Sequence, residues 1–236
     1  MSSNHPKLVF APPAAPTVQV RGKDYHFPVN RIFCVGRNYE AHALEMGMAV
    51  DREAPFYFTK TPSSIVESGA TVPYPPGTSD CHHEMELVVA IGKPAFRISV
   101  QDAMTVVFGY ACGLDMTRRD LQIVARSKGR PWDLGKSFEN SAVISEIVEV
   151  SETGHIESGN IELSVNEELR QAGNLSDLIW NVPELIADLS RYYHLQPGDL
   201  LYTGTPAGVG PVEPGDRLVG SIDHVGEITL NIAREQ

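Results

Sequence analysis

The stretch Cys81-His82-His83-Glu84-Met85-Glu86-Leu87-Val88-Val89-Ala90-Ile91-Gly92 joins a core strand to two acidic side chains. Its segment 85–91 is apolar, contains β-branched residues and is followed by a glycine, a pattern typical of a buried strand. Strand side chains alternate between the two faces of a sheet. Glu84 and Glu86 are therefore expected to point the same way at the start of a strand that continues into the core.

Two adjacent carboxylates at a buried edge repel each other and lose hydration, and a divalent cation would remove both problems. Oxygen ligands of this kind suit Mg²⁺, Mn²⁺ or Ca²⁺. A second apolar run, 106–114, ends in Asp115, which we expect to be a third ligand. From the residues alone, one alternative stays open. The acids could be solvated strand ends, or they could be paired with Arg118, Arg119 or Lys136.

A zinc site is the weaker alternative. His83-Glu84 begins an H-E-x-x-H pattern, but position 87 is Leu, so the pattern of a zinc peptidase fails. Cys81, His82 and His83 offer zinc-type donors, yet no second thiol or imidazole stands at ligand spacing nearby. The sequence therefore favours a cation held by carboxylate oxygens.

Composition limits the classes of function that the chain can have. It has 236 residues, enough for one large domain with a small appendage. Its net charge of −11, without any basic run, argues against binding to nucleic acid or to an anionic membrane. No signal peptide and no apolar run of about 20 residues is found. Three scattered cysteines fit a reducing, cytoplasmic location.

The order of short elements predicts a β-rich fold. Residues 1–30 are Pro-rich and are expected to form an extended N-terminal appendage, with the main domain at 31–236. Strands are expected at several places, including a hairpin whose Asn166-Glu167 turn is weak because a type I′ turn prefers Gly at its second position. These segments are 31–36, 55–59, 141–150, 161–165 and 168–171.

Helices and turns complete this prediction. Helices are expected at 117–128, with Leu121, Val124 and Ala125 on one face, and at 176–193, broken near Pro183. Two Pro-Gly turns near the C-terminus should each lead into a strand. The predicted class is mainly β (α+β), a strongly twisted roll of mixed sheets with short flanking helices. The glycine patterns of nucleotide-binding loops are absent.

His42 and Glu45 form a possible general base. They are three residues apart, so on one helical turn they share a face. A carboxylate beside an imidazole orients it and raises its basicity, which is how enzymes activate water. The spacing alone also fits an ordinary surface pair, and the residues leave that alternative open.

Five motifs stand in one order along the chain, and together they are specific. They are CVGRNYEAHALEM (34–46), HHEME (82–86), GLDMTRRDLQ (113–122), PWDLGKSF (131–138) and YTGTPAGVG (202–210). From about residue 31 to the C-terminus, the chain resembles the fumarylacetoacetate hydrolase superfamily, and within it the fumarylpyruvate hydrolase and acylpyruvase branch. The resemblance implies a catalytic domain with a β-rich roll, usually a homodimer.

The resemblance also implies roles for individual residues. The metal ligands would be Glu84, Glu86 and Asp115, with Mg²⁺ or Mn²⁺ as the usual cation. The catalytic residues would be His42 and Glu45, on an active-site lid that Gly47 and Met48 continue, together with Lys136. Four residues would contact substrate: Arg37, Arg119, Gln122 and Thr205.

Two positions depart from the family pattern. The prolines of the family's lysine-proline-serine segment do not coincide with Lys60-Thr61-Pro62-Ser63, which leaves the role of Lys60 open. Arg118 stands where relatives often have a small residue, so it either tunes specificity or faces solvent.

The expected activity is hydrolytic cleavage of a carbon–carbon bond in an acylpyruvate, a small β-diketo acid. Fumarylpyruvate, cleaved to fumarate and pyruvate in gentisate-type aromatic catabolism, is the favoured substrate. Two alternatives use the same enolate chemistry, namely an oxaloacetate decarboxylase and an isomerase of an unsaturated dicarboxylate. A non-catalytic, metal-dependent binding protein is the alternative from a different class.

Overall fold

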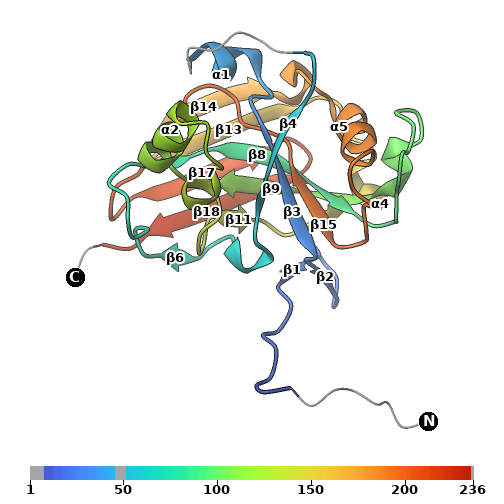
Figure 1. Cartoon of the computed structure of the whole chain (residues 1–236), viewed down its shortest axis with the longest axis horizontal. Helices are drawn as coiled ribbons and strands as arrows, with labels where there is room; N and C mark the ends of the chain where they lie inside the picture. Colours follow the sequence, from blue (N-terminus) through green and yellow to red (C-terminus); the bar gives the residue numbers. More distant parts are fainter. Residues whose placement is uncertain (1–7, 46–51, 235–236) are drawn as a thin grey trace.

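The computed structural model describes residues 8–45 and 52–234. Within this part the chain forms four β-sheets, and short helices lie around their outside (Figure 1). The predicted mainly β class, with mixed sheets and short flanking helices, is confirmed. The helices are α1 (Glu40–Glu45), α2 (Arg119–Ser127), α3 (Asp133–Lys136), α4 (Val150–Thr153) and α5 (Val182–Leu189), with three 3-10 turns, η1 (Pro62–Ser64), η2 (Ala103–Val106) and η3 (Leu175–Asp177).

The largest sheet has eight strands, and β8 and β9 lie in its centre. Glu86 of β8 lies opposite Gly113 of β9, so a residue without a side chain faces the acid. Seven strands form one path: β4 (Phe56–Lys60), β3 (Arg31–Gly36), β15 (Asp199–Tyr202), β8 (Met85–Ile91), β9 (Val107–Asp115), β11 (Ala142–Ile144) and β5 (Ile65–Glu67); β12 (Val148–Glu149) pairs with β9.

A five-stranded sheet packs against the central one. It contains β14 (Glu168–Asn174), β13 (Asn160–Val165), β17 (Arg217–Ile222), β18 (Gly226–Ile232) and β6 (Thr71–Val72) in that order. The predicted hairpin is β13–β14, and its two turn residues, Asn166 and Glu167, have φ values of 51° and 68°. The Asn166 side chain compensates for the missing glycine, because it donates to Asp216 and accepts from the backbone N–H of Arg217.

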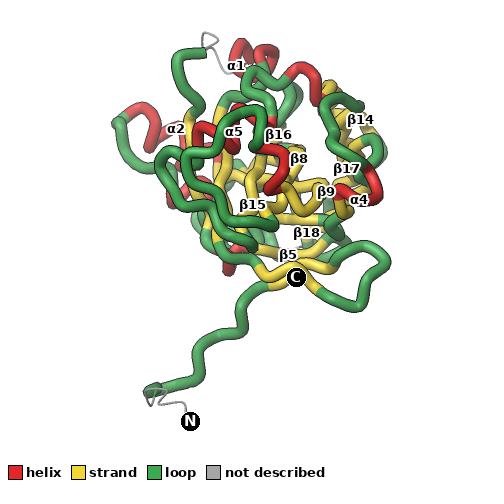
Figure 2. Tube along the Cα trace, turned by 90° about the vertical axis from the view of Figure 1, so that its right-hand side faces the viewer, coloured by secondary structure: helices red, strands yellow, loops and turns green. Residues whose placement is uncertain are grey.

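Two smaller sheets hold the edges of the site and the N-terminal segment. One consists of β10 (Thr117–Arg118), β7 (Cys81–His83) and β16 (Gly210–Pro211). The other is a hairpin of β1 (Thr17–Gln19) and β2 (His26–Pro28). Residues 8–16 run away from the body of the molecule (Figures 1 and 2). The division of the chain at residue 31 stays a prediction.

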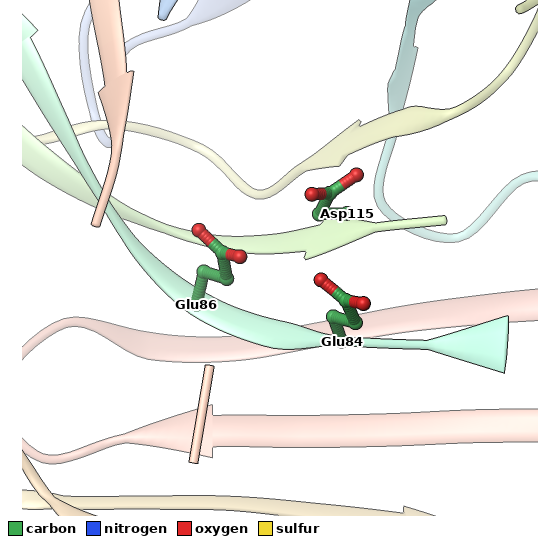
Figure 3. Close-up of side chains that lie close together, drawn as sticks. All are labelled: Glu84, Glu86 and Asp115. Atoms are coloured by element: carbon green, nitrogen blue, oxygen red, sulfur yellow. The ribbon is translucent and has the colours of Figure 1, made fainter. Parts of the chain in front are cut away.

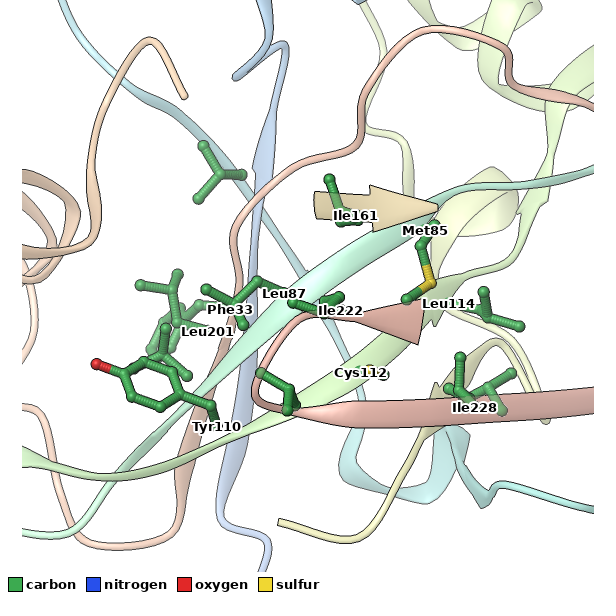
Figure 4. Close-up of a cluster of buried hydrophobic side chains, with 14 of the residues drawn as sticks. Phe33, Met85, Leu87, Tyr110, Cys112, Leu114, Ile161, Leu201, Ile222 and Ile228 are labelled. Carbon is green, nitrogen blue, oxygen red and sulfur yellow. The ribbon is translucent and has the colours of Figure 1, made fainter. Parts of the chain in front are cut away.

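Both faces of the central sheet are covered, which explains why every residue of β8 is buried and why all but Glu86 are apolar. One face packs on the five-stranded sheet, where Met85, Leu87 and Leu114 meet Ile161 and Ile228 (Figure 4). The other face carries a second cluster, which includes Val88 and Ala90 of β8 together with Val18 and Phe27 of the N-terminal hairpin. Glu86 shares the strand face of Val88 and Ala90, so the acids lie away from the main core.

The helices show which helix boundaries and buried faces the sequence pattern predicts correctly and which it does not. Helix α5 begins at Asn181, which forms a capping box with Glu184, as the Pro183 signal indicates. Helix α2 begins at Arg119 and not at 117, because Thr117 and Arg118 pair with β7. Its apolar residue Val124 is 47% exposed. The described helices include none that is long and apolar enough to cross a membrane.

The core between the two large sheets should carry much of the stability. Leu230 of β18 is fully buried in it, so Leu230→Ala should lower the free energy of unfolding by about 2–5 kcal/mol, through lost burial and the cavity left behind. Leu169 of β14 is 56% exposed, and Leu169→Ala is the matched control, with an expected change within about 0.5 kcal/mol. Urea unfolding of both variants measures the difference, and equal losses would contradict this assignment of the core.

Candidate active site

Three buried carboxylates meet at the ends of the central strands (Figure 3). Each of Glu84, Glu86 and Asp115 offers a ligand oxygen, and these oxygens lie within 4.8 Å of one another. Glu84 lies between β7 and β8, Glu86 is the second residue of β8, and Asp115 is the last of β9. Among the described residues this is the one group of three or more His, Cys, Asp or Glu side chains placed to hold a metal. The zinc alternative around Cys81 has no such cluster.

Lys136 binds two of these carboxylates at once. Its ammonium donates to Glu84 Oε2 at 2.8 Å, to Asp115 Oδ2 at 2.7 Å and to Thr117 Oγ1 at 2.8 Å. An ammonium has three hydrogens, so these bonds use all of them. Burial lowers the pKa of Lys136, but the adjacent charges of Asp115 and Glu84 outweigh it and raise that pKa, which keeps the side chain charged.

Arg119 and Lys60 complete the positive charge around the acids. Arg119 donates to Glu84 Oε1, and the alternative that the acids are ion-paired is therefore correct for two of them. Burial raises the pKa of Glu84, but Lys136 and Arg119 together pull it below its ordinary value. The Lys60 ammonium lies 2.8 Å from Asp115 Oδ1, although its hydrogen bonds go to backbone carbonyls, so this buried oxygen keeps an unused lone pair.

Sequence reasoning left Lys60 open, and the structure brings it into the site. The signal that could have found it is the alternation along β4, which places Lys60 on the same face as Phe58. Phe58 lines the hollow, and the Lys136 ammonium lies 4.8 Å from the centre of its ring. Arg118 has its charge over Phe138 and donates to the Leu134 carbonyl, so it does not line the hollow.

Glu86 is the acid without a cationic partner. Its Oε2 accepts the backbone N–H of Gly204 at 2.8 Å, and the described residues give it no ion pair. Burial, and then the charges of Asp115 and Glu84, raise its pKa well above the ordinary value. Glu86 is a buried carboxylate that its own surroundings push toward the neutral form, and it lies beside two ion-paired acids. This donor set fits a divalent cation.

His42 and Glu45 lie on α1, and His42 lines the same hollow. His42 Nδ1 is 3.2 Å from Glu45 Oε2, and the Glu45 carboxylate also accepts the backbone N–H of Gly208 at 3.1 Å. An ionised carboxylate only accepts, so the hydrogen of this bond sits on Nδ1 and leaves the Nε2 lone pair of His42 available. Gly47 and Met48, expected to continue the lid, lie outside the described residues.

The hollow brings together the expected substrate-binding residues. It is lined by Arg37, Arg119, Gln122 and Thr205, with His42, Glu84, Glu86 and Lys136. Helix α2 turns its polar side inward here, since Arg119 and Gln122 are buried and bonded to each other. The ion pair between Arg119 and Glu84 explains why the apolar residues of α2 do not form its buried face. The sequence analysis assigned no role to Trp132, although it stands in the motif at 131–138, or to Gln171, which stands in none of the five motifs. Trp132 lines the hollow and Gln171 lies directly behind it.

Comparison with known proteins agrees with this geometry. The family described as "Fumarylacetoacetate (FAA) hydrolase C-terminal" matches residues 31–233. The chain belongs to the fumarylacetoacetate hydrolase family. The five motifs of this family member all lie within the matched residues.

Individual relatives of this family member are more specific. A fumarylpyruvate hydrolase of a Ralstonia species is 59% identical over 189 residues, covering 79% of this chain and 98% of that protein. The crystal structure of fumarylpyruvate hydrolase from Pseudomonas aeruginosa, in complex with Mn²⁺ and pyruvate, matches with a TM-score of 0.94 and 47% identity, covering 97% of this chain and 100% of that one. A mitochondrial oxaloacetate tautomerase of Oryza sativa subsp. japonica is 39% identical over 209 residues, covering 87% of this chain and 92% of that protein.

Proposed function

We propose that this chain is a metal-dependent fumarylpyruvate hydrolase, which cleaves its substrate to fumarate and pyruvate. The observation that carries the proposal is that one hollow is lined by His42 and by Glu84 and Glu86 of the acidic triad, while Glu45 bonds to that histidine. A cation site alone serves many reactions, but a carboxylate-oriented imidazole beside it adds a general base that can activate water. The identity to a fumarylpyruvate hydrolase over most of the chain supports the same substrate.

Glu84, Glu86 and Asp115 would hold the cation. When bound, it supplies Lewis-acid polarisation of the keto oxygen of a 2-oxo acid. We favour Mg²⁺, because an all-oxygen donor set suits hard cations, with Mn²⁺ or Ca²⁺ as alternatives. Lys60 and Lys136 hold Asp115 and Glu84 in place from the protein side.

His42 would act as the general base. A water molecule at the mouth of the hollow gives its proton to Nε2 while Glu45 holds the Nδ1 hydrogen and fixes the ring. The water oxygen adds to the carbonyl carbon of the acyl group. The bond between that carbon and the neighbouring CH₂ carbon of the pyruvate part then breaks, and fumarate forms.

The electron pair of the broken bond goes to the pyruvate part, which leaves as an enolate and then takes up a proton. The positive charges of Lys136 and Arg119 favour this developing negative charge. Since all three hydrogens of Lys136 are already donated, its contribution is its charge and its hold on the carboxylates. Arg37, Arg119, Gln122 and Thr205 would position the substrate.

The proposal extends to cellular context. The three cysteines of the chain are free and buried, which supports a reducing cytoplasm. A homodimer and a role in gentisate-type aromatic catabolism are part of the same proposal. The resemblance to the hydrolase branch of the family supports both.

Oxaloacetate chemistry is the second candidate, favoured by the 39% identity to an oxaloacetate tautomerase. Oxaloacetate offers the same 2-oxo acid and the same enolate, so decarboxylation or isomerisation could occur on the same residues. Decarboxylation needs no base, whereas isomerisation could use the His42 imidazole to move a proton. The higher identity to a fumarylpyruvate hydrolase, 59% against 39%, therefore favours the hydrolase.

The experiment that tests the proposal follows the products of purified protein with Mg²⁺. With fumarylpyruvate, we expect fumarate and pyruvate in equal amounts, and acetylpyruvate should react more slowly. Chromatography of the products after complete conversion measures both. Consumption of fumarylpyruvate without fumarate, for example by isomerisation of its double bond, would contradict the hydrolase assignment.

A further inference from the structure

Behind the substrate hollow lies a buried amide that the mechanism above does not use. Gln171 of β14 has no exposed surface, and its side chain reaches from the five-stranded sheet to the Gly-rich loop that carries Thr205. Its Nε2 donates to Thr205 Oγ1 at 2.8 Å and to the Pro206 carbonyl at 2.9 Å. Its Oε1 accepts the backbone N–H of Met85 at 3.0 Å.

The partners of Gln171 fix which way its amide points. The Met85 N–H can only donate and the Pro206 carbonyl can only accept, so the oxygen must face Met85 and the nitrogen must face the loop. His83 Nδ1, which is 3.1 Å from the same oxygen, must then carry the ring hydrogen of that histidine. Backbone groups set this orientation of the Gln171 amide, so it does not depend on the conformation of the surrounding side chains.

The fixed amide decides the role of the Thr205 hydroxyl. A hydroxyl has one hydrogen, and Thr205 Oγ1 already receives a hydrogen from Gln171. The hydrogen of the Thr205 hydroxyl must therefore point to an acceptor other than Gln171. Because Thr205 lines the hollow, this hydrogen can point into it. A hydroxyl held in this way presents a donor, which suits a carboxylate and does not suit another donor.

The loop that carries Thr205 rests directly on β14. A Cβ atom at Gly208 would lie 2.0 Å from the carbonyl oxygen of Arg170, and one at Gly173 would lie 2.9 Å from the Pro206 ring. Gly208 also donates to Glu45, the partner of the proposed base. One strand of the second sheet therefore sets the position of the loop on both sides of Gln171.

We propose that Gln171 is a positioning residue that makes the Thr205 hydroxyl a dedicated hydrogen-bond donor to the carboxylate of the bound 2-oxo acid. This inference rests on the proposed function, because it assumes that the hollow binds such an acid. Gln171 itself does not line the hollow and would not touch the substrate. It acts by holding the oxygen of Thr205 as an acceptor, so that the hydrogen has to point toward the ligand.

The test is a double-mutant cycle on pyruvate binding, measured by calorimetry with the Mg²⁺-loaded protein. Thr205→Val should weaken pyruvate binding by about 10- to 100-fold, the usual loss for a hydrogen bond to a charged group. Thr205→Ser, which keeps the hydroxyl, should stay within about 3-fold of wild type. Gln171→Glu should also weaken binding by about 10-fold or more, because its carboxylate would take the Thr205 hydrogen for itself.

The decisive number is the effect of Gln171→Glu in the Thr205→Val background. We expect it to be less than about 3-fold there, since the hydroxyl through which Gln171 acts is gone. Equal losses in both backgrounds, or no loss from Gln171→Glu alone, would overturn the inference. If Gln171→Glu does not fold, Gln171→Met takes its place in the same cycle with the same criterion of non-additivity.

A control separates this role from a general loss of stability. Ser190 is also fully buried and bridges two backbone groups, but it lies at the C-terminal end of α5 and lines no part of the hollow. Ser190→Ala should lower the melting temperature without changing pyruvate affinity, whereas Gln171→Glu should change both. In turnover, Thr205→Val and Gln171→Glu should raise KM with little change in kcat, because the carboxylate contact is made before and during the reaction.

Failure of the inference and failure of the proposed function give different results. Additive effects on pyruvate binding in an enzyme that cleaves fumarylpyruvate overturn the role of Gln171 alone. Coupled effects in a protein that binds pyruvate but leaves fumarylpyruvate intact support that role and contradict the hydrolase. A wild-type protein that binds no pyruvate would overturn the inference together with the assumption on which it rests.

Discussion

Glu86→Gln should abolish turnover, with a loss of about 10³-fold or more, because Lewis-acid stabilisation contributes several kcal/mol and needs the full set of ligands. Glu86 is the acid without an ion pair, so its carboxylate is the one whose charge the cation would balance most directly. The amide of Gln keeps the size of the side chain and one acceptor oxygen but removes that charge. Asp115→Ala should have a similar effect.

The measurement pairs activity with direct metal binding. Calorimetry with Mn²⁺ should give one site per chain in wild type and greatly weakened binding in Glu86→Gln. Glu162 is an exposed acid on β13, and Glu162→Gln is the matched control, with unchanged binding and activity. Chelation of the wild type should remove activity and added Mg²⁺ should restore it. Full turnover by dialysed, metal-free protein would show that the cation has no part in the reaction.

His42→Ala should lower kcat by about 10²- to 10⁴-fold, the range expected when a general base is removed. Metal affinity and pyruvate affinity should stay close to wild type, because His42 bonds to Glu45 and to none of the three acids. Glu45→Gln should have a smaller effect of the same kind, since it loosens the imidazole without removing it. His26→Ala changes an exposed histidine of the N-terminal hairpin and serves as the control.

Steady-state kinetics and Mn²⁺ calorimetry on the same preparations check this prediction. Loss of Mn²⁺ binding in His42→Ala would mean that the imidazole is a ligand, and the assignment of the base would then be wrong. Retention of kcat in His42→Ala would mean that another group activates the water.

Local patterns were sufficient to predict the acidic triad and the strands that carry it. The alternation of side chains along 85–91 predicts which face of the strand carries Glu86. The apolar run before Asp115 predicts that Asp115 stands at a strand end. Both predictions depend only on residues that are neighbours in the sequence. The break before α5 was equally local, since Pro183 and the capping residues lie within one turn.

Contacts between distant segments could not be predicted in this way. Lys60 meets Asp115 although β3, β15 and β8 stand between β4 and β9 in the sheet order, and Gln171 reaches Thr205 because the hairpin packs beside the Gly-rich loop. The same limit applies to α2. Its periodicity describes an apolar face correctly, but the pairing of Arg119 with Glu84 turns the polar face inward.

The most direct test of the central claim compares kcat/KM of one wild-type preparation for fumarylpyruvate cleavage and for oxaloacetate consumption, both with Mg²⁺. We expect a higher value for fumarylpyruvate, because its hydrolysis uses the acidic triad together with the water that His42 and Glu45 are placed to activate, whereas decarboxylation and tautomerisation of oxaloacetate consume no water. A higher kcat/KM for decarboxylation or tautomerisation of oxaloacetate than for every acylpyruvate would contradict it.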